Sequence, residues 1–354
     1  MRKRSIFFFF SFLIITIGAI ISIHYMLKKK TTASSQVPSL VIFSPHPEEI
    51  TEYIVREFRQ RTGIQVRVVS EGTGELIERI KRNKGEPEAD LLWGGGIESL
   101  ETITSHFEEF ISSEESMIKD EIKSTHHLWN PFSVLPAVII YNATLIPPEH
   151  IPHSWQDLLD PWFKNRIIMA DPVKSGSSFT ILATLLKTMN KENKEVFGGW
   201  YFIEQLIKNI GDQGIASSSS LVYSSVAAGD FYAGITFENY VLSLQKTGAN
   251  VSYCYPAEGT SALPDGIALL KNAHNRKEAE LFITFVLSKD VQEILPAKWQ
   301  RRSVRKDVFI KKRSNYEDLK ENFISYPIPL AAHSRDSILN HWTELYGQYH
   351  PETQ

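Results

Sequence analysis

Short apolar runs alternate with stretches of helical periodicity in the first part of the chain, and this alternation is the strongest constraint on its fold. Residues 40–43 (Leu-Val-Ile-Phe) have the length and composition of a buried strand, and residues 48–62 carry apolar side chains at helical spacing. Residues 66–69 form a second expected strand, so the order strand, helix, strand predicts a parallel crossover unit. The alternation continues through residues 77–84 and 89–93, and the expected fold class is therefore α/β.

Small and polar residues follow each of the three expected strands. In open α/β sheets, ligands bind outside the carboxyl ends of the strands. The three loops should therefore converge on one crevice. The residues expected to line it are Ser44, His46, Thr73, Gly74, Trp93, Gly94 and Gly95.

A second α/β segment begins near Ser154. It contains expected strands over residues 167–170, 234–237 and 266–270, helices over residues 179–189 and 276–287, and an amphipathic helix over residues 336–346 in the tail.

The charge of the chain excludes one class of partner. The 354 residues include 38 Lys and Arg against 41 Asp and Glu, and six of the basic residues lie in the first thirty residues, which contain no acidic residue. The remainder has 32 basic and 41 acidic residues, a net charge of −9. We expect no nucleic-acid partner, because phosphate backbones bind basic faces. An anionic ligand would need a local site.

The N-terminal region predicts export and a membrane anchor. Residues 5–27 form an apolar run long enough for a helix to cross a hydrocarbon layer of about 30 Å, and the basic residues 2–4 before it predict that the following chain lies outside the cytoplasm. The alternative is a cleaved signal ending near the small residues 33–35. We favour the anchor, because the run is long and lysines 28–30 separate it from those residues. The single cysteine, Cys254, leaves no internal disulfide and no site for an N-terminal lipid.

Three sets of segments carry a family resemblance: 154–161 (Ser-Trp-Gln-Asp-Leu-Leu-Asp-Pro) with 168–172 and 175–178; 264–273 with 278–282 and 287–289; and 44–46 with 72–75 and 93–96. They resemble the family 1 bacterial extracellular solute-binding proteins, in the branch that contains ferric-iron and phosphorylated-solute binders. The third set is similar to the hexose-phosphate binding and sensing proteins. The resemblance covers residues 40–306.

The resemblance implies the type II periplasmic-binding-protein fold, with two lobes, hinge strands near residues 138–142 and 255–265, and a ligand cleft between the lobes. The implied domains are an anchor or signal with a linker (1–37), lobe 1 (38–141 and 266–330), lobe 2 (142–265) and a helical tail (331–354).

Two helix starts are candidate phosphate sites, because backbone N–H groups at a helix N-terminus bind a phosphate without a net positive charge. Ser175, Gly176, Ser177 and Ser178 precede the helix expected from residue 179, and Thr73 and Gly74 precede one expected from residue 75. An ordinary serine N-cap is the alternative interpretation of the first pattern, and the pattern alone favours it. The family resemblance favours the phosphate site.

Other candidate residues each have a structural alternative. Trp93 is expected either to stack on a sugar ring or to lie in the core. His46 is either a donor to the ligand or a solvated loop residue. Glu238, which follows an expected strand, either accepts hydrogen bonds from sugar hydroxyls or is a surface charge.

Iron binding and catalysis are the weaker hypotheses, and we expect no metal ion and no cofactor. The family's iron binders have adjacent tyrosines, whereas this sequence has no Tyr-Tyr pair and residues 234–240 read Gly-Ile-Thr-Phe-Glu-Asn-Tyr. His126 and His127 lack the helical spacing of metal ligands, and no Gly-x-Ser-x-Gly elbow or Walker loop is present. Residues 217–220 are interpreted as a polar loop.

The expected function is binding of a phosphorylated metabolite, a hexose phosphate, by a membrane-anchored sensor that acts with a membrane histidine kinase. The alternative is the substrate-binding subunit of an ABC importer, with an ABC permease as partner and a sugar phosphate, phosphonate or ferric iron as ligand. The apolar N-terminal run favours the sensor.

Overall fold

The computed structural model describes residues 39–83, 85–190, 195–308 and 322–350. Its compact unit comprises Leu40–Gln354. The expected anchor over residues 5–27 lies outside the described residues. Within the described part of the chain, every helix is too short or too polar to cross a membrane.

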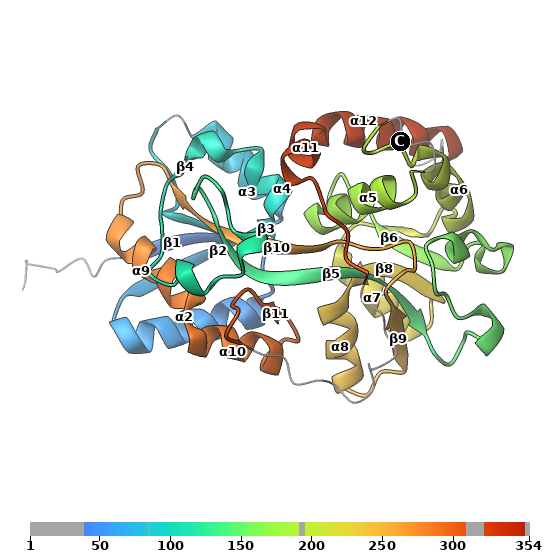
Figure 1. Ribbon diagram of the computed structural model, residues 1–354, viewed down its shortest axis with the longest axis horizontal. Coiled ribbons are helices and arrows are strands. Elements are labelled where there is room, and N and C mark those ends of the chain that lie inside the picture. The colour runs from blue at the N-terminus through green and yellow to red at the C-terminus, as the bar shows by residue number, and fades with distance from the viewer. Residues whose placement is uncertain (1–38, 84, 191–194, 309–321, 351–354) are drawn as a thin grey trace, which may run out of the picture. The chain divides into compact units, whose positions relative to one another are not determined.

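The described residues form a mixed sheet of eleven strands, and the α/β prediction is confirmed (Figure 1). Eight strands follow one another in the order β2 (Gln65–Ser70), β1 (Ser39–Ser44), β3 (Leu91–Gly96), β10 (Ala262–Leu270), β5 (Asn130–Asn142), β8 (Ala233–Phe237), β6 (Ile167–Ala170) and β7 (Ile215–Ala216). Beside this path, β4 (Phe107–Glu108) pairs with β10, whereas β9 (Val251–Cys254) and β11 (Arg302–Ser303) pair with β5.

Strand β5 belongs to two lobes. Residues 130–136 pair with β10, and residues 137–141 pair with β8. The change of partner falls between Pro136 and Ala137, where a proline is tolerated because the ladder is interrupted. The strand is buried along nearly all of its length, as expected of a strand covered on both faces. The expected hinge at 138–142 lies in the half of β5 that pairs with the second lobe.

The sheet of the first lobe contains β2, β1, β3 and β10, in that order, together with residues 130–136 of β5. One face of its sheet carries α2 (Glu48–Thr62), α9 (Arg276–Leu287) and α10 (Lys289–Lys298), and the other carries α3 (Thr73–Arg82) and α4 (Ile97–Glu101). In the second lobe, α5 (Gly176–Thr188), α6 (Trp200–Ile210) and α12 (Arg335–Tyr349) share one core, and α7 (Ser219–Ala228) and α8 (Glu238–Lys246) share another. Short 3-10 turns occupy Thr104–His106, Glu115–Met117, Asp120–Ile122, Pro148–His150, Gln156–Leu159 and Pro161–Phe163.

The C-terminal segment touches both lobes. Helix α11 (Ile328–His333) lies against α4, and Ile328 packs on the core of the first lobe. Helix α12, which includes the helix expected over residues 336–346, buries Trp342 in the core of the second lobe and contacts α6. Tyr326 also packs against this second core.

Candidate ligand-binding site

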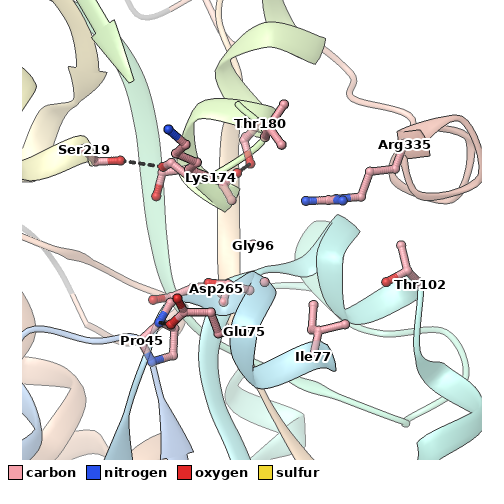
Figure 2. Close-up of a pocket in the computed structure, with 18 of the residues that line it drawn as sticks. Pro45, Glu75, Ile77, Gly96, Thr102, Lys174, Thr180, Ser219, Asp265 and Arg335 are labelled. Carbon is pink, nitrogen blue, oxygen red and sulfur yellow. Dashed lines mark hydrogen bonds between the residues drawn. The ribbon is translucent and has the colours of Figure 1, made fainter. Parts of the chain in front are cut away.

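A cleft of about 1730 Å³ lies between the lobes and is lined by residues from both of them and from the C-terminal segment. Figure 2 shows Lys174 and Ser219 on one side of it and Pro45, Glu75 and Asp265 on the other. The side chain of Arg335 points inward from the end of the cleft near Thr102.

The N-terminus of α3 forms part of the first-lobe wall. The Gly72 N–H donates to Glu75 Oε2 at 3.2 Å, and helix α3 begins at Thr73, two residues earlier than expected. Gly95 lies beside it with φ +86°, and a Cβ atom on Gly95 would be 2.8 Å from Thr73 Cγ2. Only glycine therefore fits this conformation and this close approach.

The N-terminus of α5 forms the opposing wall. The Ser175 Oγ accepts a hydrogen bond from the Ser178 N–H at 3.2 Å, so the serine N-cap exists. Gly176 nevertheless lines the cleft, and a Cβ atom on it would be 3.6 Å from Thr73. The first turns of α3 and α5, from different lobes, therefore lie side by side at the cleft.

The N-terminus of α7 reaches the same place. Its first residue, Ser219, has its Oγ 2.8 Å from Ser175 Oγ, and residues 217–220 line the cleft. The sequence pattern suggested only a polar loop here. The first-turn N–H groups of a helix lack intrahelical partners and carry a partial positive charge, so the N-termini of α3, α5 and α7 together can bind an anion.

Seven of the twelve candidate residues line the cleft, and the other five lie outside its lining. Ser44 donates its hydroxyl to Trp93 O at 2.7 Å, Ser178 donates to Ala170 O, and Gly94, with φ +115°, allows the close approach of His46. The residues that line the cleft are His46, Thr73, Gly74, Gly95, Ser175, Gly176 and Ser177, and those outside its lining are Ser44, Trp93, Gly94, Ser178 and Glu238.

Trp93 is a core residue. Its side chain is fully buried and packs edge-on against Phe132 and Phe282. Of the two expectations for this residue, the structure agrees with the core position and not with a stacking face on the ligand.

Glu238 is buried in an ion pair. Its Oε2 atom lies 2.8 Å from Arg302 Nε, and its Oε1 atom accepts from the Tyr255 hydroxyl at 2.6 Å. Both oxygens are therefore used within the protein. The sequence did not reveal this because Arg302 lies 64 positions away.

A buried polar cluster that the sequence did not reveal lies at the cleft beside His46. Arg301 Nη1 is 2.7 Å from Asp265 Oδ2 and donates to Ser133 Oγ at 3.0 Å. His46 Nε2 is 3.6 Å from Asp265 Oδ2. Burial, followed by the charge of Arg301, lowers the pKa of His46 well below its ordinary value, so its imidazole is neutral at pH 7. His46 can therefore act as a hydrogen-bonding group and not as a cation.

Two tyrosines that are distant in sequence meet on the second-lobe wall. The rings of Tyr223 and Tyr240 stack with their centroids 4.6 Å apart, and both line the cleft. Burial, followed by the neighbouring Tyr240, raises the pKa of Tyr223 to about 12, which opposes formation of a phenolate. Among the described residues, no group of three or more His, Cys, Asp or Glu side chains could hold a metal ion.

The lobes also touch through a buried carboxyl. The Thr180 hydroxyl of α5 donates to Glu98 Oε1 of α4. Glu98 Oε2 and Arg335 Nε are buried and have no hydrogen-bond partner among the described residues. Burial raises the pKa of Glu98, although the Thr180 hydrogen bond opposes this shift.

Two lobes joined by shared strands around a ligand-sized cleft define a solute-binding protein of the type II periplasmic-binding fold. Residues 100–324 match the bacterial extracellular solute-binding protein family, and this chain belongs to that family.

Known proteins agree with this assignment. The periplasmic binding protein AfuA from Actinobacillus pleuropneumoniae, solved with fructose 6-phosphate, shares the fold at a TM-score of 0.77 and 23% identity, over 87% of this chain and 98% of that chain. A protein described as mediating two-component signal transduction matches at a TM-score of 0.73 and 24% identity, over 85% and 99% of the respective chains. A putative 2-aminoethylphosphonate-binding periplasmic protein of Salmonella typhimurium is 26% identical over 298 residues, covering 82% of this chain and 85% of its own.

Proposed function

We propose that this protein reversibly binds a phosphorylated metabolite, a hexose phosphate, between its lobes and does not convert it chemically. The observation that carries this proposal is the convergence of the N-termini of α3, α5 and α7 on one cleft. Backbone N–H groups supply several donors to a phosphate, and the helix dipoles add partial positive charge.

The surrounding charges fit this mode of binding. The net charge outside the first thirty residues is negative, and His46 in the cleft is neutral. Arg301 is already held by Asp265 and Ser133. Backbone amides and hydroxyls, including those of Thr73, Ser175 and Ser177, are proposed to be phosphate donors, beside the cations Lys174 and Arg335 that also line the cleft. The phosphate esters and phosphonates in the names of related proteins agree with this ligand class.

We further propose that the protein is a membrane-anchored sensor that signals to a membrane histidine kinase. The apolar run over residues 5–27 supports the anchor, and the likeness to a two-component signalling protein supports the sensor. The alternative is the binding subunit of an ABC importer with an ABC permease as partner. The phosphonate-binding relative supports that alternative.

Calorimetry on residues 38–354 tests the ligand class, because this fragment contains the whole compact unit. Glucose 6-phosphate should bind, whereas free glucose should not. Equal affinity for glucose, or tight binding of ferric ion without binding of any ester, would refute the phosphate site.

A further inference from the structure

The stacked pair of Tyr223 and Tyr240 has no role in the proposed phosphate site. The two residues come from α7 and α8, are partly buried, and expose part of their surface to the cleft. Their rings are inclined by only 15° to each other. Phe237, at the end of β8, adds another aromatic side chain to the same lining.

The position of this pair relative to the phosphate donors follows from the helix geometry. Ser219 and Tyr223 are four residues apart on α7, so their side chains share one face of the helix with Cβ atoms about 5–6 Å apart. One helical turn of about 5.4 Å therefore separates the first-turn N–H groups from the tyrosine pair. The tyrosine pair is therefore within reach of the carbon skeleton of a phosphate ester bound at these N–H groups.

A hexose ring suits such a surface. Its C–H groups form an apolar face, while its hydroxyls point to the edge, and removal of apolar surface from water stabilises a complex by about 25 cal/mol per Å². Aromatic and hydrophobic side chains with a few well-oriented polar groups are the usual lining of small-molecule sites.

We infer that Tyr223 and Tyr240 form a stacking platform for the sugar ring, so that the cleft selects hexose phosphates over inorganic phosphate and short acyclic phosphate esters. This inference rests on the proposed function, and it names the residues that determine which phosphate ester the cleft prefers. The stacking surface expected at Trp93 in the first lobe is thus assigned to the second lobe.

The test compares variants of the full-length protein in detergent by calorimetry with glucose 6-phosphate, glycerol 3-phosphate and inorganic phosphate. Y223A and Y240A should each weaken glucose 6-phosphate binding about tenfold, a difference of roughly 1.4 kcal/mol, because each removes one ring of the platform. Their affinity for inorganic phosphate should stay within about twofold of the parent, a difference of roughly 0.4 kcal/mol. Y223F and Y240F retain the ring and should retain binding.

Controls separate the platform from other roles. Tyr201 is 75% exposed and lies outside the cleft lining, so Y201A should leave all three affinities unchanged. Circular dichroism checks that each variant folds like the parent. If an alanine variant does not fold, Y223L or Y240L, which fills more of the same space without an aromatic ring, is measured in its place.

The outcomes distinguish the two proposals. If alanine and phenylalanine variants lose equal affinity, the hydroxyls and not the rings bind the ligand, and the platform is wrong. If the alanine variants leave the affinity for glucose 6-phosphate unchanged, or lower the affinity for inorganic phosphate by the same factor, the platform is also wrong, although the phosphate site stands. If the parent binds none of the three phosphates but binds ferric ion through these tyrosines, both proposals are overturned.

Discussion

Thr73 and Ser177 lie in the first turns of α3 and α5, on opposite walls of the cleft. T73A and S177A should each weaken phosphate-ester binding by about 0.5–3 kcal/mol, because each removes a hydroxyl that can donate to a charged group. Titration calorimetry measures the change. S224A, on an exposed position of α7 outside the cleft lining, is the matched control. Unchanged affinity in both cleft variants would mean that the phosphate binds elsewhere.

Gly95 permits a second prediction at the scale of single residues. G95A should destabilise the protein by about 1–3 kcal/mol, because alanine at φ +86° is strained and its Cβ atom would clash with Thr73. Denaturant unfolding measures the loss. The control is G74A in helix α3, where a Cβ atom would meet no described heavy atom within 4 Å, and where alanine favours the helix. Equal stability of the two variants would contradict the steric argument.

Local residue patterns predicted part of the candidate site, whereas the rest depends on contacts between residues that are distant in sequence. The first turns of α3 and α5 could be predicted because a helix start is encoded by neighbouring residues. The pairing of Glu238 with Arg302, and the stacking of Tyr223 on Tyr240, depend on packing between separate elements. Trp93 was ambiguous because an apolar ring at a strand end suits both a core and a ligand surface.

Helices α4 and α5 meet through Glu98 and Thr180, and this contact should depend on pH. Because burial raises the pKa of Glu98 above 4.5 in the folded protein, folding takes up a proton at this site. The resulting stabilisation is complete below pH 4.5 and is lost as the pH rises through the folded-state pKa. E98Q keeps a neutral side chain, so its free energy of unfolding relative to the parent should increase as the pH rises above 4.5.

Urea unfolding of both proteins across this pH range measures the effect. E344Q changes an exposed glutamate of α12 and is the matched control, expected to follow the parent at every pH. Parallel pH profiles for E98Q and the parent would show that Glu98 does not take up a proton on folding.

At the level of elements, the alternation of strands and helices over residues 40–96 was predictable, whereas α6, α7, α8 and α10 were not expected. Helix α2 and its stop at Gly63, which adopts φ +74°, follow from periodicity and from a local backbone requirement. The return of the tail to both lobes, through α11 on α4 and α12 on α6, depends on surfaces formed by residues far earlier in the chain.

At the scale of the whole molecule, retention or cleavage of the N-terminal apolar segment distinguishes a sensor from an importer subunit. A retained helix over residues 5–27 should keep the protein in the membrane fraction after a high-salt wash, because salt screens charges but does not extract a spanning helix. N-terminal sequencing of the native protein checks the same point. A mature chain that starts near residues 34–37 and is free of the membrane would favour the importer.

The sheet order has a consequence for the biosynthesis of this protein. Strand β10 lies between β3 and β5 in the sheet, yet most of the second lobe is encoded between β5 and β10. A nascent chain that ends before β10 therefore leaves unpaired backbone groups along the edge of β3, and one that ends before α12 lacks Trp342 in the core of the second lobe. Prematurely terminated products should be substrates for quality-control proteases, since neither lobe is complete until nearly the whole polypeptide has been made.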